Sequence, residues 1–201
     1  MPRVILVCGY TTSVPYQKDV DYIGVDHGAY ICAKQGIQMK VAIGDFDSVT
    51  QDEFSLIQRY SLQLTCLPTH KDETDTEKAV LYALELGYTD LEVYGCLGGR
   101  MDHEMANLYL LMHRQYPITF LNDKNRIRCF RQGEYKIPKE YTYFSFLALE
   151  DCCVSGKGFA YPFDHRHFTT KDILTISNEI IDQEALLIVH QGSILVMEAN
   201  D

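Results

Sequence analysis

Two aspartates separated by one residue are the first candidates for chemistry in this sequence. Asp45 and Asp47 directly follow a short apolar run. On an extended chain, carboxylates at this spacing point the same way, and Mg²⁺ is often held by one or two carboxylates together with substrate phosphates. Capping of the next helix by Asp47 or Ser48 is the simpler interpretation. The position after a buried strand, with more acids on the following loops, favours a metal site.

A second acidic segment precedes an expected helix over residues 76–86. Asp75 lies at the start of that helix, where free N–H groups and the helix dipole favour a phosphate. Lys78, one turn further, could add positive charge. Thr74 and Glu77 also match a capping box, which by itself explains this segment. Both interpretations hold if Thr74 caps the helix while Asp75 points at a metal ion.

A third cluster combines two glycines with an arginine and an aspartate. Gly98 and Gly99 allow the backbone to approach a ligand closely, and Arg100 has the fork geometry that binds phosphate. Asp102 could orient Arg100, bind a metal-held water or cap the following helix. His103 begins that helix and shares one face with the residue at i+4, which fits either a functional or a solvated position.

These clusters follow strands in an alternating pattern of strands and helices. Strands are expected at 4–8, 21–25, 41–43, 62–67, 91–94 and 118–121, and helices at 29–35, 50–60, 76–86 and 103–114. Alternation with short connections predicts a parallel sheet covered by helices. Ligands bind such sheets beyond the carboxyl ends of the strands, so we expect the clusters at 24–28, 44–48, 71–75 and 95–103 to converge on one edge.

The pattern changes near residue 122, after which helical periodicity nearly disappears. Strands are expected at 126–130, 141–149, 173–176 and 185–196, the last of them split by a hairpin signal at Gln191-Gly192. The predicted fold is therefore an N-terminal three-layer α/β/α domain with a parallel sheet over residues 1–121. A small all-β, sandwich-like domain over residues 122–201 follows it.

Composition limits the classes of partner. The 201 residues include 46% hydrophobic and 23% charged residues and carry a net charge of −10. Such a chain is expected to be globular, and its acidity argues against binding along a nucleic-acid backbone. No apolar stretch is long enough to span a membrane. The seven cysteines show no paired metal-binding spacing, and together with the lack of a secretory signal they predict a cytoplasmic, reduced setting.

Five elements in order resemble those of the thiamine pyrophosphokinase family. They are GDFDS at 44–48, a KDxTDxxKA-like element at 71–79, a GGRxDH element ending at His103, Asp26-x-Gly28, and the late pair Ser177-Asn178. The resemblance covers most of the chain, including the change to β-structure. It implies transfer of a pyrophosphoryl group from ATP to thiamine, with Mg²⁺, giving thiamine diphosphate and AMP. It also implies a homodimer whose active sites are shared between subunits.

The resemblance also implies a role for each matching residue. Asp45, Asp47 and Asp75 would hold Mg²⁺, Arg100 and Lys78 would offset developing charge, and Asp26 and Asp102 would lie at the same site. The phosphates would be bound by the remaining polar and glycine positions of the motifs: Lys71, Asp72, Thr74, Gly98, Gly99 and His103. Ser177 and Asn178 would contact the aminopyrimidine of thiamine. The chain contains no Trp, so any stacking on thiamine must come from Tyr or Phe.

Two other functions fit parts of the pattern. Asp45-x-Asp47 after a strand resembles the nucleophile loop of haloacid-dehalogenase-type phosphatases, but the second acidic pair that those enzymes need is not found in the sequence. A catalytically silent nucleotide-binding sensor on the same fold is the other alternative. Neither a P-loop nor a dinucleotide-binding glycine motif is present.

Overall fold

The computed structural model describes residues 2–68, 73–114 and 116–201. The chain divides into two compact units. The first, called here the α/β unit, comprises Met1–Leu110 and Tyr116–Asn122. The second, the strand-rich unit, comprises Leu111–Gln115 and Asp123–Asp201. A parallel-sheet unit followed by a strand-rich one confirms the predicted fold class.

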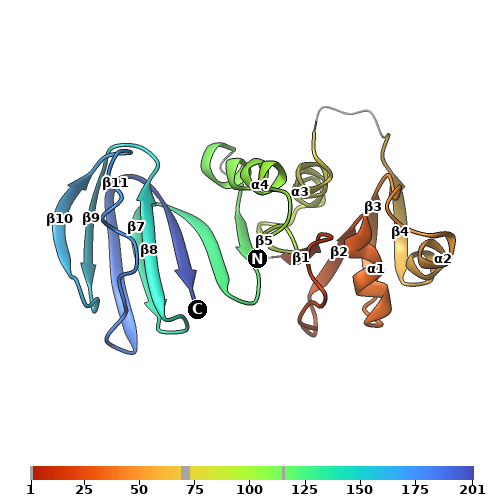
Figure 1. The fold of residues 1–201 in the computed structure, drawn as a ribbon, viewed down its shortest axis with the longest axis horizontal. Coiled ribbons are helices and arrows are strands. Elements are labelled where there is room, and N and C mark those ends of the chain that lie inside the picture. The colour runs from red at the N-terminus through yellow and green to blue at the C-terminus, as the bar shows by residue number, and fades with distance from the viewer. Residues whose placement is uncertain (1, 69–72, 115) are drawn as a thin grey trace. The chain divides into compact units, whose positions relative to one another are not determined.

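The α/β unit contains six parallel strands in the order β6-β5-β1-β2-β3-β4 (Figure 1). Their bounds are Arg3–Val7 for β1, Asp21–Val25 for β2, Met39–Gly44 for β3, Ser61–Cys66 for β4, Asp90–Tyr94 for β5 and Ile118–Leu121 for β6. Residues 4–7 of β1 are fully buried, as expected for a central parallel strand covered on both faces.

Four helices accompany these strands: α1 (His27–Lys34), α2 (Gln51–Arg59), α3 (Asp75–Glu85) and α4 (Met101–His113). Figure 1 shows α3 and α4 on one side of the strands and α1 on the other. The predicted capping box of α2 is present, because the Thr50 Oγ1 accepts from the Glu53 N–H and the Glu53 carboxylate accepts from the Thr50 N–H. Thr50 therefore caps α2, and neither Asp47 nor Ser48 has that role.

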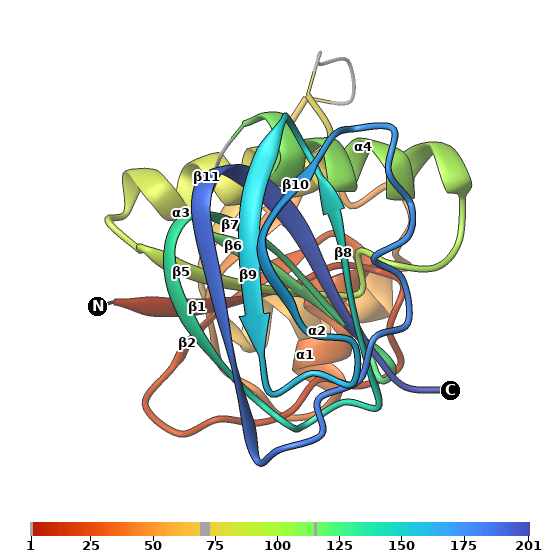
Figure 2. The same ribbon diagram turned by 90° about the vertical axis from the view of Figure 1, so that its left-hand side faces the viewer.

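The strand-rich unit is antiparallel. Its strands are β7 (Asn125–Pro138), β8 (Tyr143–Ala148), β9 (Cys152–Lys157), β10 (Phe163–Phe168) and β11 (Glu184–Ala199), paired as β10-β9-β11-β7 with β8 also on β11 (Figure 2). A cluster of phenylalanines fills the core: Phe130, Phe144, Phe146, Phe159 and Phe168.

Two local predictions in this unit are wrong. β11 is one continuous strand rather than a hairpin, since it pairs with β7 on both sides of Gly192. Gly192 has a φ of +82° and lies where the register shifts between Val189 and Ser193, so the glycine marks a bulge and not a turn. Residues 173–176 form no strand but an irregular segment in which only Thr175 is half-buried, and β9 and β10 were not predicted.

In the described part of the chain, no helix is long and apolar enough to cross a membrane. All seven cysteines are free thiols.

Candidate active site

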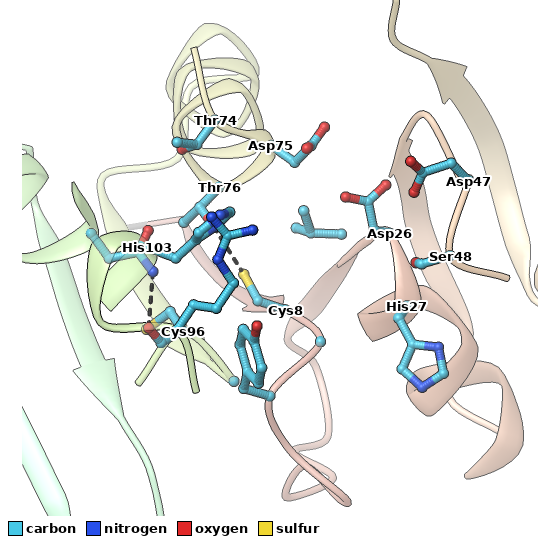
Figure 3. A pocket seen from close by; sticks show the side chains of 16 residues that line it. Cys8, Asp26, His27, Asp47, Ser48, Thr74, Asp75, Thr76, Cys96 and His103 are labelled. Atoms are coloured by element: carbon cyan, nitrogen blue, oxygen red, sulfur yellow. Dashed lines mark hydrogen bonds between the residues drawn. The ribbon is translucent and has the colours of Figure 1, made fainter. Parts of the chain in front are cut away.

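A cavity of ≈ 620 Å³ opens in the α/β unit beyond the carboxyl ends of β1, β2, β3 and β5. The strand order places β2 on one side of β1 and β5 on the other, which is the reversal of strand order where open α/β sheets bind ligands. The lining comes from the ends of these strands and the loops after them, from the first turn of α3 and from the first two turns of α4 (Figure 3): Cys8, Gly9, Tyr10, Val25, Asp26, His27, Asp47, Ser48, Thr74, Asp75, Thr76, Gly95, Cys96, Arg100, His103 and Asn107.

Asp26 connects two of these loops. Its backbone has a φ of 47°, and its Oδ1 accepts from the Phe46 N–H at 3.3 Å. Phe46, with a φ of 58°, is the middle residue of the segment that carries the aspartate pair. A Cβ on Gly44 would lie 1.8 Å from the Asp26 Oδ1. Glycine at 44 therefore leaves room for the carboxylate that holds the Phe46 backbone.

Only one aspartate of the Asp45/Asp47 pair lines the cavity. Asp47 lines the cavity, whereas Asp45 is not among the lining residues, and its Oδ1 accepts from the Asp47 N–H at 3.3 Å. The carboxylates of Asp26, Asp47 and Asp75 lie around the same space (Figure 3). Within residues 2–68, 73–114 and 116–201, no three Asp, Glu, His or Cys side chains form a ready-made metal cluster.

This donor set nevertheless suits Mg²⁺. Carboxylate oxygens are its preferred protein ligands, and one or two of them suffice when substrate phosphates and waters complete the octahedron. Asp47 and Asp75 therefore fit the predicted metal site, with Asp26 beside them. A ligand role for Asp45 stays a prediction.

The start of α3 contributes the opposite wall. Thr74 caps the helix, since its Oγ1 accepts from the Glu77 N–H at 3.1 Å, while Asp75 faces the cavity. Thr76 lies within 3.6 Å of the Cys8 thiol, measured from Oγ1 to Sγ, and burial raises the pKa of this thiol to about 12. Thr74 thus has the capping role and Asp75 is left to face the cavity, while a role of Asp75 as a metal ligand stays a prediction.

Of the two predicted lysines, the structure describes Lys78 alone, and it does not line the cavity. The Lys78 ammonium donates to the Glu73 carboxylate at 2.8 Å, and Lys78 is not a lining residue. Lys71 and Asp72 lie outside the described residues. A phosphate-binding role for Lys78 would require this ion pair to open.

The loop before α4 presents Arg100 to the cavity. Its guanidinium donates twice to Asp102, with Nε–Oδ1 3.1 Å and Nη2–Oδ2 2.6 Å, and this bidentate pair holds the pKa of Asp102 at about 2. His103 lines the cavity, and its backbone N–H also donates to Asp102. Gly98, Gly99 and Asp102 are not lining residues. Asp102 therefore orients Arg100, which is the first of the three roles that the sequence suggested for it.

In the strand-rich unit, Asn178 is almost fully buried and its side-chain amide is engaged. The Oδ1 accepts from the backbone N–H groups of Tyr161 and Glu179, and the Nδ2 donates to the Tyr161 carbonyl. Ser177 is exposed, with a φ of 60°. Asn178 therefore holds the loop at Tyr161. Its side chain has one further N–H, on Nδ2, that could donate to thiamine.

Several lining residues were not singled out from the sequence. Cys8 and Tyr10 follow β1, and Thr76 and Cys96 are uncharged members of two of the polar motifs. Their position in the sequence could have indicated Cys8 and Tyr10, because the carboxyl end of the first strand must lie at the same edge of the sheet as those of the other parallel strands.

Comparisons with known proteins agree over both units. The family model described as the thiamin pyrophosphokinase catalytic domain matches residues 16–120, and the one described as the vitamin B1 binding domain matches residues 134–193. The thiamine pyrophosphokinase of Bacillus subtilis is 32% identical over 187 residues, covering 90% of this chain and 87% of that protein.

Solved structures give the same result. A crystal structure of the Bacillus subtilis protein has a TM-score of 0.88 at 30% identity and covers 99% of both chains. The thiamin pyrophosphokinase of Geobacillus thermodenitrificans has a TM-score of 0.87 at 28% identity, covering 100% of this chain and 98% of its own. Because both domain models match in order and a 32% identical relative aligns with 90% of the chain, this chain belongs to the thiamin pyrophosphokinase family.

Proposed function

We propose that this protein transfers the pyrophosphoryl group of ATP to the hydroxyl of thiamine, giving thiamine diphosphate and AMP. Family membership supports the reaction. The observation that carries it is the cavity at the strand ends, where the carboxylates of Asp26, Asp47 and Asp75 share one space with Arg100. A polyphosphate substrate requires carboxylates that hold a metal ion and a nearby guanidinium that binds phosphate oxygens.

In this reaction the thiamine hydroxyl oxygen bonds to the β-phosphorus while the bond to the oxygen bridging the α-phosphate breaks. AMP leaves with that oxygen, and the hydroxyl proton passes to a base. Such transfers need alignment and charge stabilisation more than covalent help. Mg²⁺, held by Asp47 and Asp75, would neutralise the phosphate oxygens. The backbone N–H groups at the start of α3 and the Arg100 guanidinium would bind the remaining charge.

We further propose the arrangement that the family resemblance implies. Residues 1–121 form the catalytic, nucleotide-binding domain, and residues 122–201 bind thiamine and take part in a homodimer with shared active sites. The match of residues 134–193 to a vitamin B1 binding domain supports the thiamine assignment. The cytoplasmic setting remains a prediction.

The test is to incubate the purified protein with ATP, Mg²⁺ and thiamine and to follow AMP and thiamine diphosphate. Asp47→Asn should abolish turnover while leaving the fold intact. Asp52→Asn is the matched control, because Asp52 is an exposed acid on the adjoining helix α2, away from the cavity lining. AMP formation with another alcohol only would refute thiamine as substrate, and wild-type turnover by Asp47→Asn would remove Asp47 from the metal site.

The alternatives are not favoured, because the family match extends over both units. A phosphoryl group trapped covalently on Asp45 would support the phosphatase. ATP binding with no turnover of any alcohol would support the sensor.

A further inference from the structure

The aromatic ring of Tyr10 is held in the cavity by its surroundings. Its backbone N–H donates to the Gly95 carbonyl at 3.0 Å, and 51% of the residue's surface is exposed. The ring packs against the backbone of Gly99, where a Cβ would lie 2.4 Å from Cε1 and where φ is +117°. The ring is thus supported by main chain and keeps exposed surface in a ligand-sized cavity. Among the described lining residues it is the one phenyl-type ring.

Asn107 supplies a fixed polar group in the same cavity. The residue is 6% exposed, and its Nδ2 donates to the Cys96 carbonyl at 2.8 Å. This hydrogen bond determines which end of the amide is nitrogen, so the Oδ1 is left as an acceptor. Tyr10 and Asn107 are therefore anchored on the consecutive carbonyls of Gly95 and Cys96.

We propose that Tyr10 and Asn107 form the subsite for the base of the nucleotide, with Tyr10 stacking on the purine and the Asn107 Oδ1 accepting from its 6-amino group. The inference rests on the proposed function and adds the basis of nucleotide choice. A 6-oxo purine would place a carbonyl against the Oδ1, so adenine is selected over guanine. The vitamin B1 binding model matches residues 134–193, which leaves recognition of the nucleoside to the α/β unit.

Titration calorimetry without thiamine tests the stacking, with Mg·ATP and Mg·tripolyphosphate as the two ligands. Tyr10→Ala should weaken Mg·ATP about tenfold, since stacking of a base on an aromatic side chain is lost, and should leave Mg·tripolyphosphate within about twofold. Tyr10→Phe should restore the ATP affinity. Tyr16→Ala is the matched control, because Tyr16 is an exposed tyrosine in the same connection between β1 and β2 and lies outside the cavity lining.

The amide is tested by changing the ligand, since Asn107 is buried and its replacement could unfold the protein. GTP and the triphosphate of purine riboside, which lacks the 6-amino group, should each bind at least about fivefold more weakly than ATP to the unaltered protein. Equal affinity for the three nucleotides would overturn the assignment of Asn107.

Four further outcomes overturn the subsite. If Tyr10→Ala binds Mg·ATP normally, or loses both ligands equally, the stacking is refuted while the proposed function stands. If the variant instead raises the KM for thiamine alone, the ring serves thiamine. If the unaltered protein binds neither ligand, the proposed function and the subsite fail together.

Discussion

The hydrogen bond from Phe46 to Asp26 should control the loop that presents Asp47. Three replacements of Asp26 separate its contributions. Asp26→Asn keeps an acceptor at Oδ1 and the tolerance of a left-handed backbone but loses the charge. Asp26→Gly loses the acceptor but accepts a φ of 47° without strain, and Asp26→Ala loses both.

The expected magnitudes follow from the geometry. A hydrogen bond to a charged acceptor contributes ~1.5–3 kcal/mol, and the 3.3 Å distance places this one at the lower end. A neutral acceptor keeps roughly half of that value, so Asp26→Asn should lower the free energy of unfolding by about 0.7 kcal/mol. Asp26→Gly should cost about 1.5 kcal/mol, and Asp26→Ala about 2.5 kcal/mol, because an alanine at positive φ adds about 1 kcal/mol.

Two measurements check this order. Urea denaturation gives the stabilities, and hydrogen exchange at the Phe46 amide reports the bond directly. Protection of that amide should persist in Asp26→Asn and fall in the other two variants. Equal protection of the amide in all three, or an Asn variant as unstable as the Ala variant, would show that the bond does not hold the loop.

Three other predictions concern capping, buried charge and thiol reactivity. Thr74→Val removes the side-chain cap of α3 and should cost about 1 kcal/mol in urea denaturation. Glu198→Gln removes the buried negative charge to which the guanidinium groups of Arg126 and Arg128 donate, and should lower the free energy of unfolding by about 3 kcal/mol in the same assay. Glu140→Gln, at an ion pair with Arg126 in which the glutamate is half-exposed, should lower it by less than about 1 kcal/mol. Because burial raises the pKa of Cys8 to about 12, its alkylation by iodoacetamide, followed by mass spectrometry, should stay slow at neutral pH and rise steeply with pH. Mg·ATP should slow that alkylation further, since Cys8 lines the cavity.

The α/β unit could be predicted from sequence because its signals are local. Thr50 and Glu53 are three residues apart, and the box that they form fixes the start of α2. Strands buried on both faces, such as β1, appear as continuous apolar runs. The strand-rich unit depends on distant pairing instead. Gly192 resembles a turn until β7 is found alongside both halves of β11.

β10 was unpredictable for a related reason. Its central residues, 164–167, are all polar and exposed, and it forms the outer strand of the β10-β9-β11-β7 series. Only pairing with β9 makes it a strand, and that partner is invisible in hydrophobic periodicity.

The site residues also divide into those that the sequence indicates and those that it does not. Asp47 and Asp75 could be singled out because one closely follows a strand and the other begins a helix, positions that neighbour the same sheet edge. The side-chain direction of Lys78 was not predictable, since the nearby Glu73 competes for its ammonium. Cys8 and Tyr10 have residue types that often fill cores, so their place in the cavity lining became visible only when the strand order was known.

Backbone strain at the site gives a physical argument that its geometry is functional. Asp26 and Phe46 both adopt positive φ, a conformation that costs a residue with a side chain about 1–2 kcal/mol. They are hydrogen-bonded to each other, and Gly44 is kept without a Cβ where the carboxylate passes. A loop that only joined β3 to α2 would need none of these features, since Thr50 already starts the helix. Such strain persists where surrounding contacts enforce it and commonly collects at catalytic and ligand-binding positions. Positive φ also occurs at Asp19, His165 and Ser177, so what distinguishes this site is the combination found here: two strained residues, the hydrogen bond that joins them and the glycine that makes room for it.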